Sequence, residues 1–220
     1  MNAALERIRA LFPLEKCDAG EFARFKAGAL SVEIEWYRAR GLGNVSLVRG
    51  KAMLGLMRMD TLVINPVERD MPLFSYDLID AMGKRTVLVE YYDTLAEPTA
   101  FREEMLNGIK SGLADLPEHD LGKHWYDPLK LAPSFAKKVK RAQSPRLEGA
   151  FLFSLERYLA MAAAMPPLAG EERARKQTKA AAYVNDLLQN GGPSTDAFAK
   201  AIGKERTRAL FTRVVFGTEE

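Results

Sequence analysis

Hydrophobic and polar residues alternate with a period of two through much of the first 93 residues. In residues 30–40, alternate side chains fall on opposite faces, with Leu30, Val32, Ile34 and Trp36 on one of them. Similar runs at residues 45–49, 53–65, 73–80 and 86–93 predict further strands. The connections between them are shorter than the crossover of about a dozen residues that parallel neighbours require. We therefore predict a central antiparallel meander.

The pattern changes to helical spacing near the N-terminus and after residue 93. Residues 2–12 predict a helix with Asn2 as its cap, ended by Pro13. Further helices are predicted at residues 97–113, 134–141 (short and basic), 147–164, 170–189, 194–202 and 204–216. Ser194 is the expected cap of the helix at 194–202. Strands followed by helices indicate an α+β protein.

Composition favours one domain that spans residues 1–220, because 220 residues with 47% hydrophobic content fill one core well. No apolar run approaches the roughly 18 residues of a membrane span, so we expect a cytoplasmic protein without membrane contact. Cys17 is the single cysteine, and with two histidines it leaves little for a metal site. The sequence contains no glycine-rich nucleotide-binding loop, no G-x-S-x-G motif of the serine hydrolases and no H-E-x-x-H or C-x-x-C metal-binding motif.

The net charge of +3 is too mild for a typical nucleic-acid-binding protein. Positive charge gathers at residues 137–141 with Arg146, and again at residues 173–179. Such clusters usually form solvated helical faces. The alternative is a docking patch for an acidic partner.

Asp77 stands in the middle of a predicted central strand, where aspartate is depleted. It shares a face with Leu73, Ser75 and Ile79. One interpretation is a solvated face. The other is a carboxyl group in a covered pocket, where desolvation raises its pKa and suits it to proton transfer.

Both histidines fall in a predicted loop at residues 116–133, which also carries Trp125 and Tyr126. His119 and His124 are five residues apart in polar surroundings. We interpret them as exposed side chains.

Several segments together resemble the ferredoxin-dependent bilin reductases, a family that reduces biliverdin to phytobilin chromophores. The segments are EWYRAR at residues 35–40, LVINP at 62–66, MPLFSYDLI at 71–79 and IGKERTR at 202–208. Their order along the chain, more than any one of them, carries the resemblance.

The resemblance implies a three-layer α/β/α sandwich whose antiparallel sheet holds the tetrapyrrole against the C-terminal helices. It implies no tightly bound cofactor. Electrons come singly from reduced ferredoxin and pass through bilin radicals, with Asp77 as the proton donor. The implied substrate is biliverdin IXα, and the implied product is a phytobilin such as phycocyanobilin. We further expect a monomeric enzyme with heme oxygenase as an additional partner.

The resemblance also suggests site residues. Bilin propionates favour basic partners, for which Arg38, Arg40 and Arg58 are candidates, and we expect Ser75 and Asn190 to contact the substrate as well. Several family members carry histidine or asparagine where Thr61 lies here, next to Asp60. These two are candidate catalytic residues that face opposite ways in a regular strand. We predict Thr61 inward and Asp60 paired with a neighbour such as Arg58.

One departure from the family affects the chemistry. Many members place a second aspartate before a proline in the C-terminal half, where this chain has Gly192 before Pro193. The missing second acid motivates a non-catalytic bilin carrier as an alternative. Reduction of another linear tetrapyrrole, such as a chlorophyll catabolite, and an unrelated α+β interaction domain are further alternatives.

Overall fold

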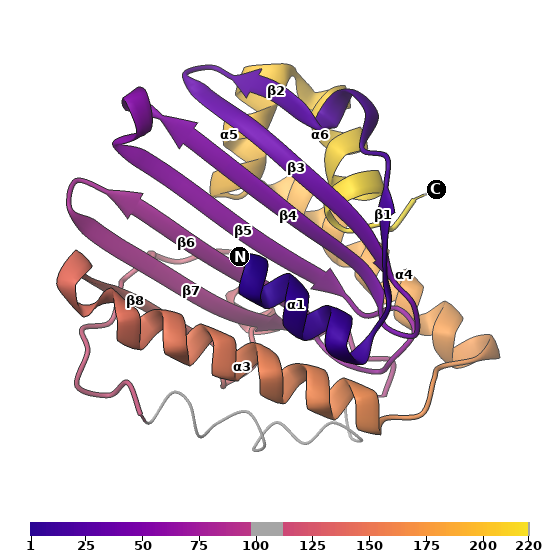
Figure 1. Ribbon diagram of the computed structural model, residues 1–220. Coiled ribbons are helices and arrows are strands. Elements are labelled where there is room, and N and C mark those ends of the chain that lie inside the picture. Colours follow the sequence, from indigo (N-terminus) through magenta and orange to yellow (C-terminus); the bar gives the residue numbers. More distant parts are fainter. Residues whose placement is uncertain (98–111, 220) are drawn as a thin grey trace.

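The computed structural model describes residues 1–97 and 112–219 (Figure 1). Within them, strands form one antiparallel sheet in the order β1-β3-β4-β5-β6-β7-β8, with β2 paired to β3. Its strands are β1 (Leu14–Cys17), β2 (Arg24–Ala27), β3 (Leu30–Ala39), β4 (Gly43–Ala52), β5 (Met57–Asn65), β6 (Leu73–Ala81), β7 (Lys84–Tyr92) and β8 (Phe135–Lys140). The predicted antiparallel meander is confirmed in β3 to β7.

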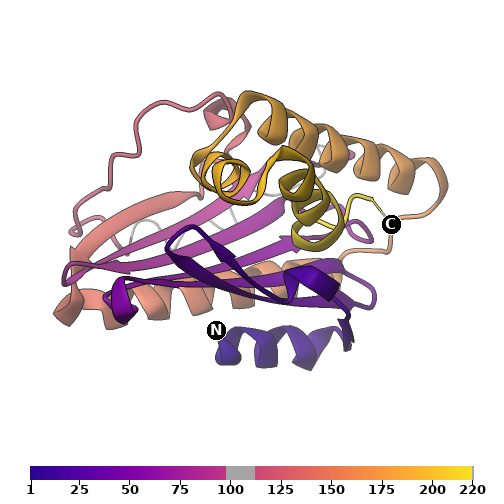
Figure 2. The same cartoon turned by 90° about the horizontal axis from the view of Figure 1, so that it is seen from above.

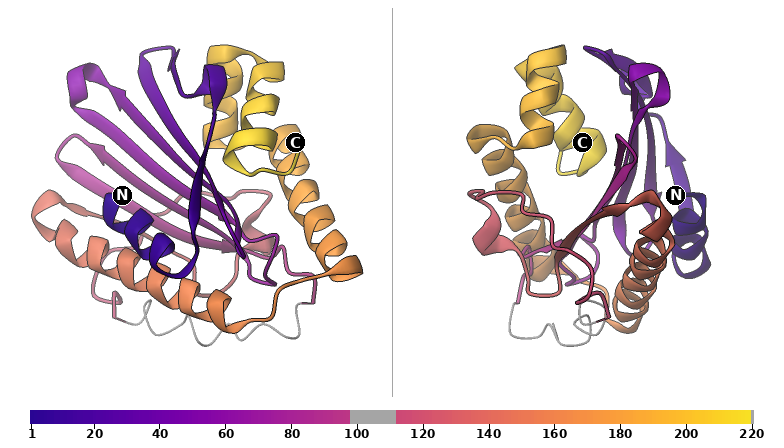
Figure 3. Two further views of the ribbon diagram at one scale, coloured as in Figure 1. Left: turned by 45° about the vertical axis from the view of Figure 1, so that its right-hand side comes forward. Right: turned by 90° about the vertical axis from the view of Figure 1, so that its left-hand side faces the viewer.

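Helices cover both faces of the sheet. They are α1 (Asn2–Leu11), α3 (Ser144–Ala164), α4 (Gly170–Asn190), α5 (Pro193–Ile202) and α6 (Lys204–Ala209), which continues into a π-helical segment, Leu210–Val215. Figures 2 and 3 show α1 and α3 on one side of the sheet and α4 to α6 on the other. The predicted α+β, three-layer α/β/α architecture is thus confirmed.

Strand alternation divides the buried side chains into two cores. Leu62, Phe74 and Tyr76 pack toward α1 and α3. Val63 and Leu73, their neighbours along the chain, pack toward α4 and the C-terminal segment. Because successive strand residues point to opposite faces, each strand supplies both cores, and Asp77 belongs to the second face with Leu73.

The turn between β6 and β7 fixes which residues of the two strands face each other. Met82 and Gly83 both have positive φ, 51° and 73°. Two-residue turns of this kind match the right-handed twist of a hairpin and therefore hold its register. In that register Asp77 pairs with Leu88 and Ser75 with Glu90.

The C-terminal segment is attached to the sheet by side-chain amides and a hydroxyl. Asn44 Nδ2 and Ser46 Oγ donate to the carbonyl oxygen of Val215 over 3.0 and 2.8 Å. Asn65 Nδ2 donates to the carbonyl oxygen of Phe216 over 2.8 Å. These bonds hold the residues 210–216 over β4 and β5, where they close one side of a cavity.

The prediction of a short helix at residues 134–141 is wrong, because this segment forms edge strand β8. Phe135, Lys137 and Val139 alternate on a buried face, and pairing with β7 supplies backbone partners. The lysines that suggested a helix suit an edge strand, where exposed charge discourages further pairing. Lys137 itself is buried and donates from Nζ to Leu116 O and Glu118 Oε1, both over 2.8 Å.

Smaller differences concern the ends of elements. Residues 53–56 form a turn before β5, with Met53 and Leu54 at positive φ. Asn2 is the first residue of α1 and caps nothing, and Ser194 lies inside α5 after Gly192 and Pro193. The helix predicted at residues 97–113 falls largely outside the described residues. Among the described helices, none combines the length and apolar character that a membrane crossing requires.

Candidate functional site

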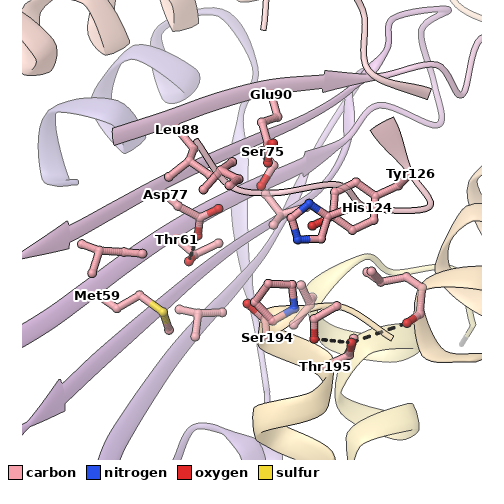
Figure 4. A pocket seen from close by; sticks show the side chains of 18 of the residues that line it. Met59, Thr61, Ser75, Asp77, Leu88, Glu90, His124, Tyr126, Ser194 and Thr195 are labelled. Carbon is pink, nitrogen blue, oxygen red and sulfur yellow. Dashed lines mark hydrogen bonds between the residues drawn. The ribbon is translucent and has the colours of Figure 1, made fainter. Parts of the chain in front are cut away.

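A cavity of about 590 Å³ lies between the sheet and the C-terminal helices, and Figure 4 shows part of its lining. Strands β4 to β7 form its floor, and the loop at residues 119–126, α4, α5 and the C-terminal segment form the rest. The volume is within the range of about 300–1,000 Å³ that small-molecule sites occupy. Its apolar lining includes Val48, Met59, Val63, Leu73, Ile79, Leu88, Leu187, Phe198, Leu210, Phe211, Val215 and Phe216.

Asp77 projects from β6 into this cavity (Figure 4). Thr61 is its direct partner on β5, and the Thr61 hydroxyl donates a hydrogen bond to Asp77 Oδ1. Burial raises the pKa of Asp77 to about 6, the Thr61 hydrogen bond opposes this rise, and the negative charge of Glu90 adds to it. A solvated Asp77 face is therefore excluded, and Thr61 points inward as predicted.

Glu90 on β7 is a second acidic residue in the cavity wall that the sequence analysis missed. Its Oε1 lies 2.8 Å from Lys130 Nζ, and its Oε2 accepts a hydrogen bond of 2.9 Å from the Tyr92 hydroxyl. Both oxygens thus have partners from the protein. The signal in the sequence was an acidic residue inside a β-branched and aromatic run, on the same face as Leu88 and Tyr92.

The prediction of two exposed histidines is wrong, since His119 and His124 both line the cavity and are partly buried. Burial and the nearby Lys138 lower the pKa of His119. The His124 ring stacks on Tyr126, with ring centres 4.9 Å apart and planes 8° apart. Nδ1 of His124 is enclosed and has no hydrogen-bond partner among the described residues.

The histidine loop is held against the end of α4. Trp125 Nε1 donates to the carbonyl oxygen of Gly191 over 2.8 Å. The His124 backbone N–H donates to Asp127 Oδ2 over 2.8 Å. Lys130 Nζ lies 5.0 Å from the centre of the Tyr126 ring, a cation–π contact that adds to its pairing with Glu90.

The junction between α4 and α5 brings Gly192, Pro193, Ser194 and Thr195 into the cavity wall. A Cβ at Gly192 would lie 3.1 Å from Leu187 Cδ1, so a larger residue there requires the leucine to move. Asn190 is exposed and does not line the cavity, which contradicts its predicted role. Asn190 is the last residue of α4, and its side chain faces solvent there.

None of the three predicted arginines lines the cavity. Arg38, Arg40 and Arg58 are exposed, and Arg40 pairs with Glu15. The positive side chains in the lining are instead Lys84 and Lys138, both exposed. Ser75, in contrast, lies in the wall beside Asp77 as predicted.

Asp60 points away from the cavity, because even-numbered positions of β5 face the side of α1 and α3. It therefore cannot reach a ligand beside Asp77. Within residues 1–97 and 112–219, Asp60 and Arg58 do not form the predicted ion pair. On this face of the sheet Arg85 pairs with Asp80, at 2.6 Å, and with Glu148.

Metal ligands do not gather at this site or elsewhere in the described part of the chain: no three of its histidine, cysteine and acidic side chains could hold one ion. Besides hydroxyl groups, the described lining of the cavity carries a carboxyl group of raised pKa, a paired glutamate, two imidazoles and two lysines. They can donate protons and bind an anionic ligand.

No protein-family model and no curated protein match this sequence. The fold, however, is similar to a solved structure of phytochromobilin synthase from tomato in complex with biliverdin. The TM-score is 0.78 over 99% of this chain and 81% of that chain, at 11% sequence identity. The fold that the resemblance to the bilin reductases implied is thus confirmed.

Proposed function

We propose that this protein reduces a linear tetrapyrrole, with biliverdin as the first candidate and Asp77 as a proton donor. The observation that carries the proposal is a carboxyl group with a pKa of about 6 in the wall of a large apolar cavity. That cavity occurs in a fold whose solved neighbour is in complex with biliverdin.

The chemistry requires both electrons and protons. Addition of one electron makes a bilin more basic, so an acid beside the pyrrole rings can then protonate it. Asp77 suits this step because its raised pKa keeps part of it protonated near neutral pH. The Thr61 hydroxyl orients the carboxyl group, and the apolar walls exclude water from the radical.

The electrons, we propose, come one at a time from reduced ferredoxin, and two electrons with two protons reduce one double bond. A phytobilin such as phycocyanobilin is the proposed product. The propionate groups of the substrate would reach the mouth of the cavity, where Lys84 and Lys138 offer positive charge.

An anaerobic absorption titration with biliverdin, followed by ferredoxin, its reductase and NADPH, tests the proposal. A shifted bound spectrum that then converts to a new pigment supports it, and chromatography identifies the reduced bond. A stable complex that never changes colour favours a carrier, and conversion of a chlorophyll-derived tetrapyrrole instead identifies a different substrate. Absence of any tetrapyrrole binding contradicts the proposal.

A further inference from the structure

We propose that His124 is a second catalytic residue, which donates a proton to the bound tetrapyrrole from the side opposite Asp77. This inference rests on the proposed function. Each double bond that is reduced takes up two electrons and two protons, whereas Asp77 carries one proton. A second donor in the same cavity would complete the reaction without waiting for Asp77 to be reloaded.

The position of His124 is the first argument. Asp77 and Thr61 belong to the sheet, while His124 faces the cavity from the loop that crosses above it (Figure 4). A flat tetrapyrrole between the two would meet a carboxyl group on one side and an imidazole on the other. Stacking on Tyr126, and the hydrogen bond of the His124 backbone to Asp127, fix the ring in this place.

The hydrogen bonding of the ring is the second argument. Within the described residues, Nδ1 of His124 is enclosed and forms no hydrogen bond to a protein group. A buried polar atom without a partner is rare and unfavourable, and a catalytic role is one of the explanations for it. Because Nδ1 is enclosed, the ring meets the cavity through its other atoms, and a pyrrole or lactam group there would bond to Nε2.

The other titratable groups of the cavity fit the role less well. Glu90 already uses both carboxyl oxygens in contacts with Lys130 and Tyr92. The hydroxyls of Tyr92, Tyr126 and Tyr183 are much weaker acids, because burial raises the pKa of each. Burial and the nearby Lys138 lower the pKa of His119, which disfavours the protonated form that a donor needs. Lys84 and Lys138 are exposed to solvent and not enclosed with the ligand.

Two reduced ferredoxins give one electron each to the tetrapyrrole and are oxidised. The Asp77 carboxyl group and the His124 imidazolium give one proton each, and two hydrogens are added across one double bond. A carboxylate and a neutral imidazole remain, and both take up protons from water once the product leaves.

Two substitutions at one position isolate the proton. His124→Gln keeps the hydrogen-bonding ability and most of the volume but cannot act as an acid, whereas His124→Glu keeps an acidic proton. We expect both variants to bind biliverdin within about threefold of the original protein. In single-turnover reactions, His124→Gln should lose about 100-fold or more in the rate of product formation and accumulate a coloured radical. His124→Glu should recover at least tenfold of this loss.

The absorption spectrum of bound biliverdin between pH 5 and 9, without ferredoxin, gives a readout that needs no turnover. In the Asp77→Asn background, which removes the titration of Asp77 itself, we expect a pH-dependent spectral step that His124→Gln removes and that Lys123→Gln, an exposed change on the same loop outside the cavity wall, retains. Retention of the step in His124→Gln overturns the contact between this ring and the pigment.

The outcomes separate the two proposals. If His124→Gln converts biliverdin at the original rate, the role of His124 is wrong and the reductase stands. If the original protein binds biliverdin but never reduces it, the reductase is wrong, and loss of the spectral step in His124→Gln still supports the contact. If no biliverdin binds, both proposals are overturned.

Discussion

The hydroxyl of Thr61 on β5 donates a hydrogen bond to Asp77 on β6, its direct neighbour across the two strands. The bond joins two residues 16 positions apart and holds a carboxyl group inside an apolar cavity. Since hydrogen bonding to a carboxylate favours its charged form, Thr61 opposes the effect of burial on the pKa of Asp77.

Replacement of Thr61 by valine should therefore raise the pKa of Asp77 further above about 6, because burial then acts without the opposing hydrogen bond. Carboxyl ¹³C NMR of labelled aspartate across pH 4–9 measures the shift. Thr86→Val is the matched control, because Thr86 also lines the cavity but makes no hydrogen bond to Asp77. An unchanged or lower pKa in Thr61→Val would contradict the assignment.

Glu90→Gln should move the pKa of Asp77 in the opposite direction. The negative charge of Glu90 raises this pKa, so its removal lowers it. The same NMR titration reports the change. Glu33→Gln, at an exposed ion pair with Arg24 on the outer strands, serves as the control. A rise in the Asp77 pKa would show that the two groups do not interact as described.

The sequence was sufficient to predict the antiparallel sheet, because short connections permit only antiparallel neighbours. It was also sufficient to predict the face on which Asp77 lies, because the alternation of side chains along a strand is a local property. It assigned Thr61 and Ser75 correctly to one face for the same reason. It failed for residues 134–141, where the helical interpretation of a lysine-rich run missed the pairing with β7. That pairing depends on residues more than 40 positions away.

The parts of the site that were missed come from long-range packing. His124 enters the cavity because Trp125 hydrogen-bonds to Gly191 at the end of α4, 66 residues further on. Glu90 faces Lys130 because the loop returns over β7. The arginines were assigned by residue type, whereas the register of the strands decides which charges lie near the cavity. No local pattern carries this information.

Asp77→Asn should leave pigment binding largely intact and reduce turnover by about 10²–10⁴-fold, or stall it at a coloured radical. The matched change Asp60→Asn, on the opposite face of the sheet, should retain turnover. Biliverdin titration followed by addition of reduced ferredoxin measures both properties. Full activity in Asp77→Asn would remove Asp77 from its proposed role.

The same substitution should also change how stability depends on pH. The folded protein holds the Asp77 proton up to pH about 6, above the ordinary aspartate pKa of 3.8, so it binds more protons than the unfolded chain between these values. The stabilisation from this group is complete below pH 3.8 and is lost as pH rises through 6. Urea unfolding at pH 4, 5, 6 and 7 should show Asp77→Asn gaining stability relative to the original protein as pH increases.

Lys84→Met and Lys138→Met should each weaken biliverdin binding about two- to fivefold, the effect expected of exposed ion pairs. The loss should shrink in high salt, because screening weakens such pairs. Titrations at low and high salt measure the effect, with exposed Lys200→Met on α5 as the control. Equal affinity in all three variants would place the propionates elsewhere.

Lys176 on α4 offers a test of how the helical layer is held on the sheet. It is completely buried, and its Nζ donates to Met71 O over 2.5 Å, Thr94 O over 2.9 Å and Thr94 Oγ1 over 2.8 Å. Burial lowers its pKa from 10.5 to about 7. Lys176→Met removes this donor from the two carbonyl oxygens, while Thr94 Oγ1 still accepts from the Leu73 N–H over 3.2 Å, and the loss should cost about 1–3 kcal/mol of unfolding free energy. Lys200→Met should change it by less than about 0.5 kcal/mol.

The sign of the pH dependence distinguishes this buried lysine from an ordinary one. Between pH 7 and 10.5 the unfolded chain keeps the Lys176 proton that the folded protein releases, so stability rises with pH in this range. Urea unfolding followed by circular dichroism at pH 7 and pH 9 should show a larger increase for the original protein than for Lys176→Met. An equal increase in both would mean that Lys176 stays charged when buried, held by its three hydrogen bonds.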